Sequence, residues 1–283
     1  MQLKSEQGLL YIVATPIGNL QDICFRAIDI LAEVDKIAVE DTRHSKKLLH
    51  HYNIDTKCIS LHEHNERQIT FDLIESLKNG SSIALISDAG TPLMSDPGYF
   101  LVKTARYEGI EIRAIPGPCA LIAALSVAGL STDRFCFEGF LPAKTSARKS
   151  RLEALLGEAR TLIFYESPHR IMAMLEDFEA VFGTNRNIVL VKELTKLHET
   201  VKSGYITDLL EWLREDPARQ KGEMVVLVEG AESSHLTDNN ESKRLLTILL
   251  NELPLKQAVK LAAQYLDSNK NELYAMALTL KDS

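Results

Sequence analysis

Five short apolar runs, each followed by a stretch with helical spacing, occupy the first 130 residues. Parallel strands must be joined by crossovers of a dozen or more residues, which are usually helices. The repeated strand-then-helix pattern therefore predicts an open, largely parallel α/β sheet. The expected strands cover residues 8–14, 36–40, 57–61, 82–87 and 110–115, and the expected helices end near residues 34, 52, 78, 108 and 128.

A second set of alternating runs begins after residues 129–133, which contain a glycine and polar residues. It predicts a second α/β domain, with a sheet that is mostly parallel or mixed. A polar, turn-rich segment at 231–241 is typical of a linker, and three short amphipathic helices follow it. We therefore expect two α/β domains around an interdomain cleft, with a small C-terminal helical module. The expected domains are 1–130, 131–231 and 241–283.

Composition excludes several classes of protein. Hydrophobic residues make up 45% and charged residues 25% of the chain, as in soluble globular proteins. The longest apolar stretch, 118–130, is shorter than the roughly 17–25 residues that cross a bilayer, and the N-terminus lacks the features of a signal peptide. The four cysteines are scattered singly, which suits a reducing cytoplasm. A net charge of −7 disfavours binding of nucleic acid through bulk charge, but leaves room for a local basic patch.

Polar residues, glycines and prolines follow every expected strand of the first half. Ligands of open α/β sheets bind beyond the carboxyl ends of the strands, so these loops would form one binding edge. The alternative is that loops are generally rich in such residues, and for any single loop this is the simpler explanation. The loops are 15–20, 40–44, 62–66, 87–98 and 116–119.

Several common motifs are missing or incomplete. The chain has neither the dinucleotide-binding glycine pattern nor a P-loop. Asp88 and Asp96 could coordinate Mg²⁺, but such residues equally form turns and helix caps. His62 and His64 lack a third zinc ligand at an established spacing, and the sequence gives no support for a nucleophilic serine. We therefore expect no metal site.

The second half has strand-end residues of its own, so that two crevices could form one cleft. Between them, residues 143–151 contain Lys144, Arg148, Lys149 and Arg151 and no acidic residue. This cluster could bind phosphates, or it could be the solvated start of a helix. These patterns indicate an enzyme with two α/β domains.

Eight segments carry a resemblance to a known family. They read ATPIGNLQD, VEDTRHSKKLL, LISDAGTPLMSDPG, IPGPCALIAALSVAGL, FEGFLPAK, FYESPHR, KELTKLHE and KGEMVVLVEG. In this order, over about residues 9–230, they closely resemble the ribosomal RNA small subunit methyltransferase I family. That family belongs to the tetrapyrrole-methylase-like, class III S-adenosylmethionine-dependent enzymes. The C-terminal segment is similar to the helical module of the same family.

The resemblance implies 2′-O-methylation of a cytidine in the decoding region of 16S ribosomal RNA, within the small ribosomal subunit. It also implies S-adenosylmethionine as methyl donor and a homodimer as the working unit. The C-terminal helices could form a helix-turn-helix reader, but their positive and negative charges nearly cancel, so we interpret them instead as a module that docks on the ribosomal subunit. The cofactor contacts carried over by position are Pro16, Ile17, Asp88, Ala89, Gly90, Thr91, Ala120, Leu121, Tyr165, Leu194, Gly222, Glu223 and Met224.

Strand-end acids and histidines are the candidates for a general base, because a ribose hydroxyl does not ionise near neutral pH. For each of them a cap or a salt bridge is the alternative role. The candidates are Glu40, Asp41, His62, Glu166 and Glu193, and the cations assigned to RNA phosphates are Arg43, Lys144, Arg148, Lys149 and Arg170. Two other functions stay open, namely methylation of a corrin or porphyrin and a non-catalytic role in ribosome assembly.

Overall fold

The computed structural model describes residues 8–231, 239–266 and 269–281. The first sheet has the strand order β3-β2-β4-β1-β5, and every pairing in it is parallel, as the alternating pattern predicts. Its strands are β1 (Leu9–Val13), β2 (Lys36–Val39), β3 (Cys58–Ser60), β4 (Ile83–Ile86) and β5 (Glu111–Ile115).

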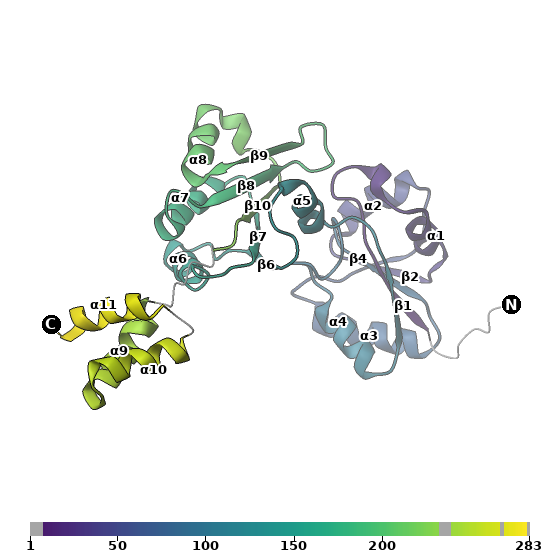
Figure 1. Cartoon of the computed structure of the whole chain (residues 1–283). Coiled ribbons are helices and arrows are strands. Elements are labelled where there is room, and N and C mark those ends of the chain that lie inside the picture. Colours follow the sequence, from purple (N-terminus) through teal and green to yellow (C-terminus); the bar gives the residue numbers. More distant parts are fainter. Residues whose placement is uncertain (1–7, 232–238, 267–268, 282–283) are drawn as a thin grey trace. The chain divides into compact units, whose positions relative to one another are not determined.

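Helices cover both faces of this sheet (Figure 1). On β4, Ala84 and Ile86 pack toward one face while Ile83 and Leu85 pack toward the other, which explains the uninterrupted apolar run. One face is covered by α1 (Phe25–Glu33) and α2 (Thr42–His51), and the other by α3 (Glu66–Lys78) and α4 (Tyr99–Tyr107). A short 3-10 turn, η1 (Leu20–Asp22), precedes α1.

The second sheet is mixed, with the order β6-β7-β10-β8-β9. Strand β6 (Phe135–Phe140) is parallel to β7 (Thr161–Glu166), whereas β10 (Met224–Val228), β8 (Asn187–Lys192) and β9 (Thr200–Tyr205) pair antiparallel. One face carries α6 (Thr145–Glu153), α7 (Ile171–Phe182) and α8 (Ile206–Glu215). The turn η2 (Pro217–Gln220) precedes β10.

Helix α5 (Ala120–Ala128) covers the other face of the second sheet. Its Leu121 and Leu125 pack with Ile163 and Val225 of that sheet. The helix therefore packs with the second half, although it precedes residue 130, where the sequence suggests a boundary. Both sheets belong to one compact unit, and the expected division of that unit stays a prediction.

The C-terminal helices form a second compact unit with its own core. They are α9 (Asn239–Glu252), α10 (Leu255–Tyr265) and α11 (Lys270–Lys281), and they match the three amphipathic helices expected here. Leu246, Val259 and Leu273 supply buried contacts, one from each helix. Most of the expected linker, residues 232–238, lies outside the described residues. None of the helices in the described ranges has the length and apolar character needed to cross a membrane.

Candidate functional site

The loops after β1 and β4 lie where the strand order reverses direction. From β1 the chain crosses toward β2 and β3, and from β4 it crosses toward β5 on the opposite side. The two loops are joined by a pair of backbone hydrogen bonds: Thr15 N–H donates to Gly90 O at 2.8 Å, and Gly90 N–H to Thr15 O at 3.0 Å. Open α/β sheets bind ligands at such a reversal, so this edge is the expected place for a site.

The loop between β4 and α4 has an unusual backbone. Gly90 and Gly98 have φ values of 86° and 121°, and the non-glycine residues Leu93 and Ser95 have φ values of 72° and 74°. A Cβ atom on Gly90 would lie 3.3 Å from Ile17 Cγ2. Positive φ at non-glycine residues is costly and is often found at binding sites, because neighbouring contacts must hold it in place.

Two contacts fix this loop to the rest of the fold. The hydroxyl of Thr91 donates to Pro118 O at 2.9 Å. At the other end, Glu66 Oε1 accepts from the N–H groups of Gly98 at 3.0 Å and Phe100 at 2.8 Å, at the start of α4. The loop is therefore fastened on both sides.

The second sheet contributes the facing wall. The hydroxyl oxygen of Tyr165, on β7, accepts a hydrogen bond from Leu121 N–H at 3.1 Å. Its ring lies edge-on to Phe137 and Phe140 of β6, with centroids 4.9 and 5.7 Å away. Burial, with Cys119 adding to it, raises the pKa of Tyr165 far above its usual value, so the phenol stays neutral.

Together these segments enclose a cavity of about 430 Å³. Val191, Leu194, Met224 and Val225 supply apolar surface on the side of the second sheet. A pocket with apolar walls and a few polar groups is typical of small-molecule sites. The proposed cofactor residues that line it are Ile17, Asp88, Ala89, Gly90, Thr91, Ala120, Tyr165, Leu194, Glu223 and Met224.

Acidic side chains concentrate on one side of the cavity. Glu40, Asp88 and Asp96 all line it, and Asp88 Oδ1 accepts from Asp41 N–H at 3.1 Å. Burial, reinforced by Asp88 and Asp96, raises the pKa of Glu40. Burial and the nearby Asp88 likewise raise the pKa of Asp96, against the opposing effect of a hydrogen bond with Ser87. A cationic ligand would relieve the mutual repulsion of these crowded carboxylates, so the cavity favours such a ligand.

Three residues of the proposed cofactor set, Pro16, Leu121 and Gly222, do not line the cavity. Leu121 nevertheless supports it, through its hydrogen bond to Tyr165. Gly222 has a φ of 94°, and a Cβ there would lie 2.6 Å from the Glu193 side chain, so the position requires glycine; its contact with the cofactor stays a prediction.

Of the candidate bases, only Glu40 and Glu166 line the cavity. Asp41 caps α2 by accepting from Arg43 N–H at 2.7 Å, and hydrogen bonds from Arg43 lower its pKa. Burial acts to raise the pKa of Glu193, but the N–H of Glu223 and the Lys196 ammonium outweigh it, so the pKa is lowered. The backbone N–H of His62 donates to Asn65 Oδ1 at 2.8 Å, and the His62 side chain does not line the cavity. These placements fit the cap and salt-bridge alternatives.

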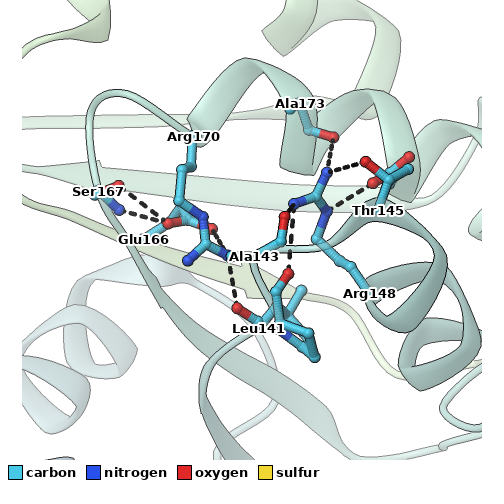
Figure 2. A network of polar contacts seen from close by, with 10 residues as sticks. Leu141, Ala143, Thr145, Arg148, Glu166, Ser167, Arg170 and Ala173 are labelled. Atoms are coloured by element: carbon cyan, nitrogen blue, oxygen red, sulfur yellow. Dashed lines mark hydrogen bonds and ion pairs between the residues drawn. The ribbon is translucent and has the colours of Figure 1, made fainter.

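The candidate RNA-binding cations occupy different environments (Figure 2). Arg170 Nη2 donates to Leu141 O at 2.6 Å and lies 3.2 Å from Glu166 Oε2, while Glu166 Oε1 accepts from Ser167 N–H at 2.7 Å. Arg43 is highly exposed and pairs with Asp41. Lys144 is exposed on the loop before α6.

Arg148 is only 3% exposed, because it lies on the same face of α6 as the buried Leu152. Its Nε donates to Asp177 Oδ2 at 2.6 Å, and Lys149 Nζ lies 3.5 Å from Asp177 Oδ1. Figure 2 shows the Arg148 guanidinium turned toward Thr145 and the carbonyl of Ala173. A buried, paired guanidinium has no surface for a phosphate, so Arg148 is removed from the proposed RNA-binding set.

Sequence reasoning also missed part of the cavity lining. Asp96, considered above with Asp88 as a possible Mg²⁺ ligand, was not assigned to the cofactor set, although it lies in the same loop as Asp88. The aromatic and apolar residues gave no separate signal, since their positions depend on how the two sheets face each other. The lining residues outside the proposed cofactor and base sets are Met94, Ser95, Asp96, Cys119, Phe140, Ser167, Pro168, Val191 and Val225. Within the described ranges, no three His, Cys, Asp or Glu side chains are arranged to hold a metal ion.

Comparisons with known proteins agree with this architecture. Residues 9–210 match the family model of the tetrapyrrole (corrin/porphyrin) methylases, and residues 237–281 match that of the RsmI C-terminal HTH domain. The chain is 54% identical over 276 residues to ribosomal RNA small subunit methyltransferase I of Haemophilus influenzae, covering 96% of each chain. It is 52% identical to the protein of that name from Escherichia coli O157:H7, covering 97% of this chain and 96% of the relative.

Solved structures show the same fold at low identity. Uroporphyrin-III-C-methyltransferase from Thermus thermophilus is 19% identical with a TM-score of 0.56, covering 79% of this chain and 94% of that one. Diphthine synthase is 17% identical with a TM-score of 0.59, covering 78% and 90%. These likenesses concern the fold alone.

Proposed function

This chain belongs to the ribosomal RNA small subunit methyltransferase I family, a branch of the tetrapyrrole methylases, and from that membership we propose that it transfers a methyl group from S-adenosylmethionine to 16S ribosomal RNA. The acceptor in this proposal is the 2′-hydroxyl of a cytidine in the decoding region, within the small subunit. The working unit is a cytoplasmic homodimer. The C-terminal module, Asn239–Lys281, docks on the subunit.

The observation that carries the proposal is the cavity between the two sheets. Its residues fit S-adenosylmethionine, because carboxylates complement a positively charged sulfonium and the apolar wall suits the uncharged parts of the molecule. When bound, S-adenosylmethionine supplies an electrophilic methyl group. Glu40, Asp88 and Asp96 give the site negative charge, and the fastened loop 88–98 holds two of these groups in place.

Alignment of the acceptor should matter more than proton transfer. Positioning of reacting groups contributes roughly 7–11 kcal/mol. A general base contributes about 10²–10⁴-fold, or roughly 3–5 kcal/mol. Among the candidates we favour Glu40 as proton acceptor, since it lines the cavity and its pKa is raised. Glu166 is engaged by Ser167 and Arg170, which suits a positioning role.

The test measures transfer of labelled methyl groups to small ribosomal subunits that lack the modification, with uroporphyrinogen as a parallel acceptor. A 2′-O-methyl group blocks alkaline cleavage at its nucleotide, so resistance to alkali followed by mass spectrometry identifies the position. Labelling of uroporphyrinogen instead would establish a tetrapyrrole methylase. Failure to bind S-adenosylmethionine in calorimetry would favour a non-catalytic assembly factor.

The role of Glu40 is tested with Glu40→Gln, and Asp41→Asn serves as the neighbouring control. Asparagine keeps the cap of α2, so the control should leave activity nearly intact. Loss of the base should lower kcat by about 10²–10⁴-fold. Equal activity of the two variants would exclude Glu40 as proton acceptor.

A further inference from the structure

An aromatic surface lies on α3 and α4, and its residues are not among those that line the cavity. Phe71 of α3 is 62% exposed and Tyr99 of α4 is 67% exposed. The Phe71 ring meets the half-buried Phe100 ring edge-on, with centroids 6.2 Å apart. The two helices run side by side on one face of the first sheet (Figure 1). Contiguous exposed apolar surface often marks an interaction site.

Each part of this aromatic surface carries a cation. The guanidinium carbon of Arg67 lies 5.7 Å from the centre of the Phe100 ring, and Lys103 Nζ lies 5.9 Å from that of Tyr99. Across the described part of the chain, neither cation has an acidic partner within salt-bridge distance. We call Arg67, Phe71, Tyr99, Phe100 and Lys103 the α3/α4 patch.

The α3/α4 patch is joined directly to the cavity. Asp96 lines the cavity and precedes Tyr99 by three residues, so their Cα atoms are at most about 11 Å apart. Glu66, next to Arg67, binds the N–H groups that open α4. A chain bound on the patch would therefore lie beside the loop that shapes the cavity.

We propose that the α3/α4 patch binds unpaired RNA nucleotides next to the one that enters the cavity. This inference rests on the proposed function and assigns a surface to its substrate. Sequence-specific RNA recognition commonly uses splayed bases stacked on aromatic rings or guanidinium planes, with cations on the phosphates. The patch offers both kinds of contact. Two cations without acidic partners also favour a polyanion over a protein partner, which would have to bury them.

The test uses a fluorescein-labelled, single-stranded RNA oligonucleotide and measures its anisotropy with the full chain. Phe71→Ala and Tyr99→Ala should each weaken binding by about 5- to 150-fold, the effect of losing one stacked base. The control is Phe25→Ala. Phe25 is 88% exposed and belongs to α1, which packs on the opposite face of the sheet. All three variants should keep the parent affinity for S-adenosylmethionine.

Charge is tested separately with Lys103→Gln, with Arg26→Gln on α1 as control. Losing one phosphate contact should reduce the slope of log affinity against log salt by about 0.7 for Lys103→Gln and leave it unchanged for Arg26→Gln. With small subunits as substrate, Tyr99→Ala should raise KM and leave kcat at saturation nearly unchanged.

The proposed role of the α3/α4 patch would be wrong if Tyr99→Ala bound the oligonucleotide as tightly as Phe25→Ala. It would also be wrong if the parent protein did not bind the oligonucleotide. A change from dimer to monomer in Tyr99→Ala, with RNA affinity unaltered, would assign the surface to a second copy of the chain instead. Failure of the proposed function is distinguishable: the parent would then bind the oligonucleotide in this patch but transfer no methyl group to subunits.

Discussion

Replacing Arg148 with alanine should destabilise the second half of the main unit, because it leaves Asp177 buried without its main partner. Both residues are almost fully buried, at 3% and 5% exposure, and Arg148 Nε lies 2.6 Å from Asp177 Oδ2. At an effective dielectric of about 20 this distance gives roughly 6 kcal/mol of gross attraction, much of it offset by desolvation. Removing one partner of a buried pair costs about 3–5 kcal/mol. Lys149, 3.5 Å from Asp177, should hold the cost of Arg148→Ala near 3 kcal/mol.

The assay is urea unfolding followed by the fluorescence of Trp212, the only tryptophan, which packs on the same core as α7. The control is Arg214→Ala. The Arg214 side chain and that of its partner Glu176 are both more than half exposed, so this substitution should lower the free energy of unfolding by at most about 1 kcal/mol. The double variant Arg148→Met, Asp177→Leu should recover most of the loss. Equal unfolding midpoints for Arg148→Ala and Arg214→Ala would refute the reasoning.

Three further predictions concern the cavity and its loop. Gly90→Trp should abolish binding of S-adenosylmethionine in calorimetry, whereas Gly109→Trp, with a similar φ but no neighbour within 4 Å, should retain it. Because burial raises the pKa of Asp96, the Asp96 carboxyl binds a proton more readily in the folded state than in the unfolded state. The free energy of unfolding should therefore fall as the pH rises above about 4, the ordinary pKa of an aspartate. Asp96→Asn should therefore be more stable than the parent at about pH 7 in urea unfolding, with a gain that shrinks toward pH 4; a constant gain would contradict this. Glu66→Ala should lower stability by about 0.5–2 kcal/mol and weaken S-adenosylmethionine binding, and Glu66→Gln should restore both, because its amide oxygen can accept the same bonds.

The strands and the binding edge could be predicted from sequence for one physical reason. The central parallel strands β2 and β4 are almost entirely buried, so apolar runs locate them, and parallel strands end at the same edge, so the loops after them mark the expected binding edge. Strand β9 (Thr200–Tyr205) has no recognisable strand pattern in the sequence, because it is an antiparallel edge strand with half-exposed residues and little apolar content. Its signal is too weak to separate from a loop.

Side-chain environments could not be predicted in the same way. Arg148 belongs to a run of basic residues that resembles a solvated helix start, and its partner Asp177 lies 29 residues away on another helix. The α3/α4 patch likewise joins Phe71 to Phe100 across two helices. Both arrangements depend on how helices pack on the sheets, and no local pattern in the sequence encodes that packing.

The placement of α5 determines where the polypeptide can be divided. A cut after residue 130 would leave the first fragment with an apolar helix that has lost its sheet, and the second fragment with an uncovered sheet face. A cut within residues 116–118, before α5, would keep helix and sheet together. Fragments cut within residues 116–118 should therefore reassemble into an active protein when mixed. Fragments cut after residue 130 should precipitate.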